Sequence, residues 1–194
     1  IRYKNHKKIM SDVNKFTVVG DGATGKTCIL VSFVENKFPE DYVPTVFDNY
    51  ATELTVDSKE YSIQVWDTAG QEDYAEVRPL SYESTNVFII VFSVENRDSF
   101  ENISKWKEEL TKHEPDVPIV LVGNKIDMRK EGASTEEFVS EEEGKKVQKE
   151  IGADAYIECS AKEQTNLSLI FEECVRAMLR KKGGDKSQNA QAEG

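Results

Sequence analysis

The hydrophobic residues of this chain follow two periodicities in alternation. Short apolar runs typical of buried strands occupy residues 16–19, 61–66, 87–92, 119–122 and 156–159. Apolar residues at helical spacing occupy residues 26–35, 100–113, 141–151 and 167–180. Strands that alternate with helices predict a parallel sheet joined by crossover helices.

One pair of strands breaks this alternation. Residues 52–56 and 61–66 flank a polar turn at Asp57-Ser58, which predicts a hairpin and one antiparallel edge strand. We therefore predict a single α/β domain with a doubly wound, six-stranded, mostly parallel sheet. Ligands of such sheets bind beyond the carboxyl ends of the strands, so motifs that follow different strands should meet in space.

A glycine-rich loop directly follows the first strand. Residues 20–27 read GDGATGKT and match G-x-x-x-x-G-K-[ST]. Its glycines let backbone N–H groups converge on a phosphate, Lys26 adds a positive charge, and Thr27 offers a hydroxyl to Mg²⁺. The helix that starts near Gly25 adds its positive end. The alternative is a glycine turn and a capped helix that bind no ligand.

A second motif predicts which base is bound. Residues 124–127 read NKID after the strand at 119–122 and match N-K-x-D. Asp127 would pair with N1–H and the 2-amino group of guanine. Adenine lacks these donors, and sites of this kind can reject such an analogue by about 10⁴ to 10⁵-fold. The sequence ECSAK at 158–162 would supply a backbone N–H, from Ala161, to the guanine O6. Taken alone, NKID is also compatible with a plain polar turn.

Over residues 15–179 the chain resembles the small GTPases of the Ras superfamily, and more narrowly the Rho family. The narrower resemblance rests on FPEDYVPTVFDNY at 38–50, WDTAGQEDYAEVRPLSY at 66–82, and Cys28 after the phosphate loop. It implies a P-loop three-layer α/β fold and a GTP hydrolase that acts as a molecular switch. Engagement of effectors in the GTP state, in actin cytoskeleton signalling, is implied by the resemblance alone.

The resemblance also implies a metal site and two switch segments. Thr27 and Thr45 would bind Mg²⁺ directly, and Asp67 would reach it through water. Thr45 and Gly70 would each donate a backbone N–H to the γ-phosphate, so loss of that phosphate would relax both segments. Thr45, which follows a proline, could instead simply begin a strand.

The implied catalytic residues are Gln71, Lys26 and Gly22. Gln71 would orient the attacking water, while Lys26, Mg²⁺ and the loop amides supply electrostatic stabilisation. A side chain at Gly22 would obstruct Gln71. The family counterpart of Arg78 is not a catalytic arginine. We therefore expect slow unassisted hydrolysis, of roughly 10⁻⁴ s⁻¹, accelerated by an activating protein that inserts an arginine in trans.

Around the base, Phe38 would pack against guanine and the stem of Lys125 would lie along the other face. Phe38 could instead belong to the core. The nucleotide-binding residues implied in full are Asp21, Gly22, Ala23, Thr24, Gly25, Lys26, Thr27, Cys28, Phe38, Tyr42, Thr45, Gly70, Asn124, Lys125, Asp127, Ser160, Ala161 and Lys162.

Composition narrows the remaining possibilities. The chain has 194 residues and a formal net charge of −11, which argues against a nucleic-acid partner. The chain has two histidines and three isolated cysteines, and their spacing does not match that of zinc ligands. The cysteines are therefore expected to be buried, reduced thiols in a cytoplasmic protein. No apolar run is long enough to cross a membrane. We expect a monomer with tag residues at 1–9, a GTPase domain at 10–182 and a flexible tail at 183–194.

Three departures from the Rho pattern affect the expected partners. The segment between Asp127 and Glu158 is shorter than in typical Rho proteins, so the Rho insert helix is expected to be truncated or missing. Ala75-Glu76 replaces an acidic-then-basic pair, which would change the charge seen by partners. No prenylated cysteine follows Cys174, so attachment to the cytoplasmic face of membranes would need a C-terminal lipid absent from this chain. The implied partners are nucleotide exchange factors, GTPase-activating proteins, a GDP dissociation inhibitor, and effectors such as formins or kinases.

Two other functions remain open at this stage. One is a GTP-binding module with negligible hydrolysis, against which Gln71, Gly22 and Thr45 argue. The other is a phosphotransferase acting on a small metabolite, for which an acceptor-binding domain is not evident and Asp127 would have no use.

Overall fold

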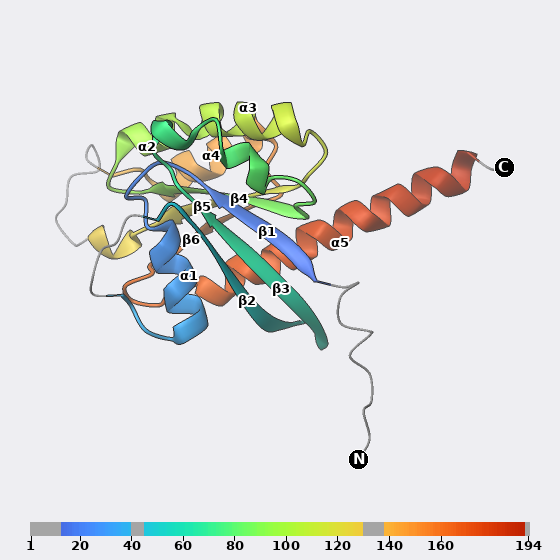
Figure 1. Ribbon diagram of the computed structural model, residues 1–194, viewed down its shortest axis with the longest axis horizontal. Helices are drawn as coiled ribbons and strands as arrows, with labels where there is room; N and C mark the ends of the chain where they lie inside the picture. Colours follow the sequence, from blue (N-terminus) through green and yellow to red (C-terminus); the bar gives the residue numbers. More distant parts are fainter. Residues whose placement is uncertain (1–12, 40–44, 130–137, 193–194) are drawn as a thin grey trace, which may run out of the picture.

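The structure is a computed structural model that describes residues 13–39, 45–129 and 138–192 (Figure 1). Its sheet has the strand order β2-β3-β1-β4-β5-β6. β2 runs antiparallel to β3, and the other neighbouring strands are parallel. The strands are β1 (Asn14–Val19), β2 (Phe47–Val56), β3 (Lys59–Thr68), β4 (Val87–Ser93), β5 (Ile119–Asn124) and β6 (Ala155–Glu158). The predicted six-stranded, doubly wound sheet with one antiparallel edge strand is confirmed.

The core lies on both faces of the sheet because the central strands are buried on both sides. In β4, Val87, Ile89 and Val91 face one apolar cluster, whereas the alternate residues Phe88 and Ile90 face the other. Helices α1 (Lys26–Glu35) and α5 (Leu167–Ala192) cover the first face. Helices α3 (Ile103–His113) and α4 (Glu141–Ile151) cover the second, as Figure 1 shows. Continuous apolar runs in the sequence therefore correspond to two-sided burial.

The hairpin prediction is also confirmed, with a longer first strand. Asp57 and Ser58 both have positive φ, 49° and 65°, as the two central residues of a type I′ turn require. β2 starts at Phe47, five residues before the predicted run, because residues 47–51 pair in register with β3 although their side chains are largely exposed. Hydrophobicity cannot reveal a strand that is held mainly by backbone pairing.

Two helix predictions were wrong in detail. The segment predicted as one helix over 100–113 is two helices, α2 (Arg97–Glu101) and α3. α2 begins early because the side chain of Asn96 caps it by accepting a hydrogen bond from Ser99 N–H. α5 spans Leu167–Ala192, whereas the apolar pattern predicts a helix that ends at residue 180. The expected flexibility of residues 183–194 stays a prediction. In Figure 1 the end of α5 projects away from the sheet, and its backbone groups bond within the helix without needing tertiary contacts.

Some expectations cannot be compared with the structure. Residues 1–9, expected to be a tag, Tyr42, and residues 130–137 of the region expected to be shortened between Asp127 and Glu158 lie outside the described residues. In the described part of that region, a 3₁₀ turn at Ile126–Met128 is followed by α4. None of the helices in the described ranges combines the length and apolarity needed to cross a membrane.

Candidate phosphate and guanine site

The phosphate loop joins the carboxyl end of β1 to the start of α1. Gly25 has φ +88°, in the left-handed region, and a Cβ there would lie 2.4 Å from Nδ2 of Asn124. Backbone conformation and space both require glycine at this position. Helix α1 begins at the next residue, Lys26, so its first N–H groups face the loop.

Lys26 is held inside this loop. Its Nζ donates hydrogen bonds to the carbonyls of Gly20, at 2.7 Å, and Asp21, at 2.8 Å. Burial lowers the pKa of Lys26 to about 8, although the carboxylates of Asp67 and Asp21 oppose the shift. A buried ammonium group with carbonyl partners is stabilised by any further negative charge, such as a phosphate oxygen.

Thr27, Thr45 and Asp67 come together from three segments. The Thr27 hydroxyl donates to Oδ2 of Asp67 at 2.5 Å, and Oγ1 of Thr45 lies 2.5 Å from Oγ1 of Thr27. Asp67 is fully buried at the end of β3, and its Oδ1 has no hydrogen-bond partner among the described residues. Burial raises the pKa of Asp67 despite the opposing effects of Thr27 and Lys26. Two hydroxyls and an unsatisfied carboxylate oxygen form a donor set that fits Mg²⁺.

Gly70 and Gln71 pack against the phosphate loop. A Cβ on Gly70 would lie 2.3 Å from the carbonyl oxygen of Gly20 and 2.5 Å from the nitrogen of Gly22. The backbone at Gly70 therefore packs directly against the backbone of the phosphate loop, with no space for a side chain between them. A Cβ on Gly22 would lie 3.9 Å from Cγ of Gln71, in ordinary van der Waals contact, so any larger side chain would press on Gln71. The structure thus brings the three predicted catalytic positions, 22, 26 and 71, to one place.

A cleft of about 510 Å³ opens over these residues. Its lining is Gly22, Ala23, Gly25, Lys26, Thr27, Cys28, Val31, Phe38, Pro39, Thr45, Thr68, Ala69, Gly70, Gln71 and Lys125. The phosphate loop, the predicted metal ligands Thr27 and Thr45, and Lys125 of the base motif therefore border one continuous space, whereas Asp67, Asn124 and Asp127 are not part of its lining.

The base motif is joined to the phosphate loop through Asn124. This buried side chain donates from Nδ2 to the carbonyl of Thr24 at 2.9 Å and accepts at Oδ1 from the N–H of Ala161 at 3.2 Å. The hydroxyl of Ser160 donates to Oδ1 of Asp127 at 2.6 Å. The loops after β1, β5 and β6 are thereby fixed to one another. The N–H of Ala161, expected to face a base, is directed at Asn124.

The other predicted base contacts differ in position. Phe38 and Lys125 both line the cleft. Phe38 also packs against the apolar core, which agrees with the alternative that this residue belongs to the core. Nζ of Lys125 forms an ion pair with Glu95 at 2.6 Å. Lys162 is exposed and does not line the cleft. Cys28, expected to be buried, is only half-buried, and burial raises the pKa of its thiol.

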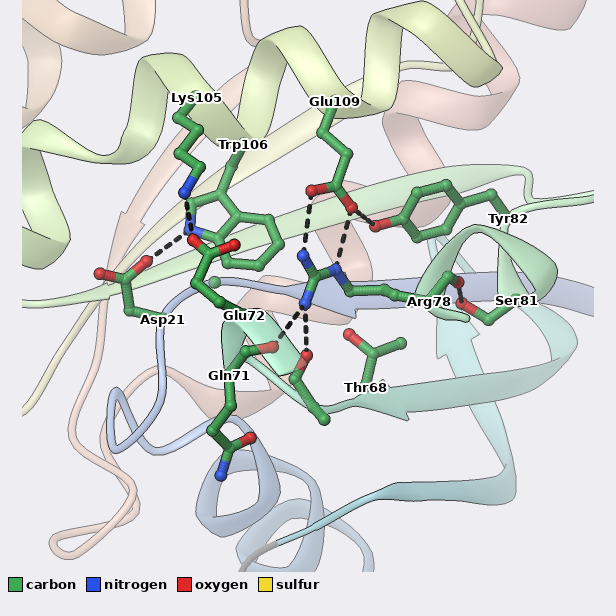
Figure 2. Close-up of polar contacts among 12 residues, drawn as sticks. Asp21, Thr68, Gln71, Glu72, Arg78, Ser81, Tyr82, Lys105, Trp106 and Glu109 are labelled. Atoms are coloured by element: carbon green, nitrogen blue, oxygen red, sulfur yellow. Dashed lines mark hydrogen bonds and ion pairs between the residues drawn. The ribbon is translucent and has the colours of Figure 1, made fainter. Parts of the chain in front are cut away.

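Sequence reasoning missed one group of residues beside this site. In Figure 2, Trp106 and Glu109 of α3 reach the phosphate loop and the segment after β3, respectively. Trp106 donates from Nε1 to Oδ1 of Asp21 at 2.6 Å, and Glu109 binds Arg78. Their only sequence signal is a shared face of an amphipathic helix, which does not separate such contacts from ordinary packing.

Fold and site together define a P-loop protein that binds a guanine nucleotide. The family model described as the Ras family matches residues 15–180. The Ras-like GTP-binding protein RhoL of Drosophila melanogaster is 53% identical over 168 residues, which cover 86% of this chain and 87% of that protein. The chain belongs to the Ras family and is a Rho-like small GTPase, a GTP-binding switch that hydrolyses GTP.

Proposed function

We propose that this chain is a magnesium-dependent Rho-like switch whose slow GTP hydrolysis times its release of effectors. The observation that carries the proposal is the buried ammonium of Lys26, bonded to two loop carbonyls at the floor of a cleft bordered by Gln71 and Gly70. This charge is positioned for β- and γ-phosphate oxygens, and the backbone N–H of Gly70 is proposed to bind the γ-phosphate.

The proposed Mg²⁺ site consists of Thr27, Thr45 and Asp67. Its support is the unpartnered Oδ1 of Asp67, a fully buried atom that would otherwise lose its hydration without compensation. When bound, Mg²⁺ neutralises charge on the phosphates. Thr27 and Thr45 would offer their hydroxyl oxygens, and Asp67 would orient a water between itself and the ion.

Guanine selectivity is proposed to come from Asp127. Ser160 donates to one oxygen of this carboxylate, which fixes its orientation, and since each carboxylate oxygen has two lone pairs, both oxygens can still accept from N1–H and the 2-amino group. Phe38 and Lys125 would enclose the base. Ala161 would contribute to O6 only if its N–H is shared between the ligand and Asn124, and Lys162 would approach from the surface.

For hydrolysis, Gln71 is proposed to orient the attacking water, beside Lys26 and a side-chain-free Gly22. Arg78 cannot serve as the arginine of the transition state here, because its guanidinium binds Glu109 and the carbonyls of Ala69 and Gln71. This supports a requirement for an activating protein that supplies an arginine in trans.

Small GTPases of this family work with regulators and effectors. We propose exchange factors, GTPase-activating proteins and a GDP dissociation inhibitor as the regulators, and formins or kinases of actin signalling as effectors. A cytoplasmic location, with lipid-dependent attachment to membranes, is part of the same proposal. A pull-down that compares GTP-analogue and GDP forms tests the effectors, and capture independent of nucleotide would contradict the switch.

A competition titration tests the central proposal. We expect GDP, but not ADP, to displace a fluorescent guanine nucleotide from the purified chain, with a difference of about 10⁴-fold or more. In Asp127→Ala this preference should collapse, whereas the matched variant Asp154→Ala should keep it, because Asp154 is exposed and accepts the N–H of Ile119, at the opposite end of β5 from the N-K-x-D motif. Equal affinity for GDP and ADP would refute the proposal. A phosphate-release assay with bound GTP then separates slow hydrolysis from none.

A further inference from the structure

Arg78 is a buried arginine whose charge is directed inward. It lies in the 3₁₀ turn Arg78–Ser81 and is 5% exposed. Nε and Nη2 donate to the two carboxylate oxygens of Glu109, at 2.9 and 3.0 Å, in a bidentate pair. Nη1 donates to the carbonyl of Ala69 at 2.8 Å and to that of Gln71 at 3.3 Å. One planar group therefore joins helix α3 to the backbone on both sides of Gly70 (Figure 2).

The surroundings fix the plane of this guanidinium. The ring of Trp106 lies 4.4 Å from Cζ of Arg78, a cation–π contact, and the hydroxyl of Tyr82 donates to Oε1 of Glu109 at 2.5 Å. Burial alone would raise the pKa of Glu109, but the hydrogen bonds from Arg78 and Tyr82 overcome it and lower the pKa below its usual value. The carboxylate thus stays ionised and bound to its partner.

Helix α3 and its N-cap residue Asn102 also hold the phosphate loop. Trp106 and Asn102 donate to the two carboxylate oxygens of Asp21, at 2.6 and 2.7 Å. Asp21 adjoins Gly22, which faces Gln71. Helix α3 is therefore a common support for the loop that would bind phosphate and for the residue that would orient water.

We propose that Arg78 is a positioning residue of GTP hydrolysis, acting through the backbone of Gln71 and supported by Glu109 and Trp106. This inference rests on the proposed function, in which Gln71 orients the attacking water. The physical argument is geometric: a displacement of about 1 Å at a reacting group can cost about 10²-fold in rate. A guanidinium bound at four sites restricts the carbonyl of Gln71, and hence the direction of its side chain, more strongly than loop backbone can by itself.

Lysine is the informative substitution. Arg78→Lys keeps the positive charge for Glu109, but its single ammonium cannot bind both carboxylate oxygens and two carbonyls in one plane. We expect single-turnover GTP hydrolysis to fall about 10-fold or more. Dissociation of bound GDP should change less than about twofold, since Gly70, which lies between the two carbonyl contacts, would bind only the γ-phosphate that GDP lacks. Glu109→Gln is the milder variant, because glutamine keeps the shape of the side chain and one oxygen that can accept a hydrogen bond from Arg78. It should slow hydrolysis by a smaller factor.

Arg97→Lys is the matched control. Arg97 also pairs with a glutamate of a neighbouring helix, Glu143 at 2.6 Å, but this pair lies between α2 and α4 and is more exposed. The Arg97→Lys variant should hydrolyse GTP at a rate within about twofold of the wild type, because a surface ion pair contributes little. Thermal unfolding of the GDP-bound forms, and the amount of nucleotide retained per protein, show that each variant is folded.

A double-mutant cycle separates positioning from a merely structural role. If Arg78 acts through Gln71, then Gln71→Leu combined with Arg78→Lys should hydrolyse GTP no more slowly than Gln71→Leu alone. If the two factors multiply, or if neither Arg78→Lys nor Glu109→Gln slows hydrolysis in a folded, nucleotide-loaded protein, the inference is overturned. If Gln71→Leu alone leaves the rate unchanged, the proposed function fails as well, so the two failures are distinguishable.

Discussion

The side-chain amide of Asn124 donates a 2.9 Å hydrogen bond to the carbonyl of Thr24, which lies 100 residues earlier in the chain. The same side chain accepts the N–H of Ala161. A single buried amide therefore couples the end of β5 to the phosphate loop and to the loop after β6. Asn124 is not part of the cleft lining, so it would stabilise the bound state by fixing these loops.

Asn124→Ala should accordingly weaken both stability and nucleotide binding. It leaves a buried carbonyl and a buried N–H without partners, at a cost of about 1 to 3 kcal/mol for each. We expect nucleotide dissociation to accelerate about 10-fold or more, which corresponds to about 1.4 kcal/mol. Release of a fluorescent GDP analogue measures this. Asn86→Ala is the control, because Asn86 also accepts a backbone N–H, that of Lys15 at 2.8 Å, away from the cleft. Asn86→Ala should lower the melting temperature without changing the rate of nucleotide dissociation. If both variants accelerated dissociation equally, Asn124 would have no specific role in nucleotide binding.

The contact between positions 22 and 71 leads to a second prediction. The γ carbons of valine at Gly22 would extend from a Cβ that already lies 3.9 Å from Cγ of Gln71. Gly22→Val should displace Gln71, and Gln71→Leu should remove its amide, so each should slow single-turnover hydrolysis by about 10- to 100-fold while nucleotide remains bound. Gly183→Ala in α5 is a suitable control, since a Cβ there would meet no atom within 4 Å and the backbone of Gly183 is not in the left-handed region. Unchanged single-turnover rates in both site variants would refute these roles.

Backbone-determined features of the site were predictable from sequence, whereas side-chain pairings across the fold were not. The phosphate loop and NKID could be located because they follow buried strands, and strands that run parallel bring their carboxyl ends to one edge. By contrast, the Arg78–Glu109 pair joins a 3₁₀ turn to α3 across 31 residues, and either residue alone is a common surface type. The break at Asn102 was missed because α2 and α3 share a continuous helical pattern. Asn102 is also bonded to Asp21, a tertiary contact without a local signal.

Because one carboxylate oxygen of Asp67 is buried without a partner among the described residues, Asp67→Asn should have opposite effects on the stability of the nucleotide-free protein and on its use of Mg²⁺. In Asp67→Asn the buried negative charge is removed, so the nucleotide-free protein in chelator should be as stable as the wild type or more stable. The bound form should need at least about 10-fold more Mg²⁺ to retain GDP, because a carboxylate assists a hard cation more than an amide does. Dissociation of fluorescent GDP over a series of Mg²⁺ concentrations measures the shift. In the wild type, EDTA should accelerate dissociation. An unchanged Mg²⁺ requirement in Asp67→Asn would remove this carboxylate from the metal site.

The start of α4 predicts a pH-dependent contribution to stability. Hydrogen bonds from Arg97, and then from the backbone N–H of Ser140, lower the pKa of Glu143 to about 2, from an ordinary value of 4.5. Glu143 and Ser140 form a capping box, in which the Ser140 N–H donates to Glu143 at 2.8 Å. Since the pKa is depressed in the folded state, the ionised side chain stabilises the fold above pH 4.5, and this contribution fades as the pH falls from 4.5 toward 2.

Glu143→Gln tests this contribution, because glutamine retains the capping geometry but cannot ionise. Glu143 is partly exposed, so solvent screening limits the expected loss at pH 7 to about 1 kcal/mol or less. The difference in melting temperature between variant and wild type, measured on the GDP-bound proteins, should be constant from pH 7 to about pH 5 and should shrink at lower pH. Glu142→Gln, exposed in the same helical turn, controls for the general effect of charge at a helix start. A difference that stays constant below pH 4.5, or that is equal for Glu142→Gln, would show that the ion pair and capping box do not stabilise α4 through the charge of Glu143.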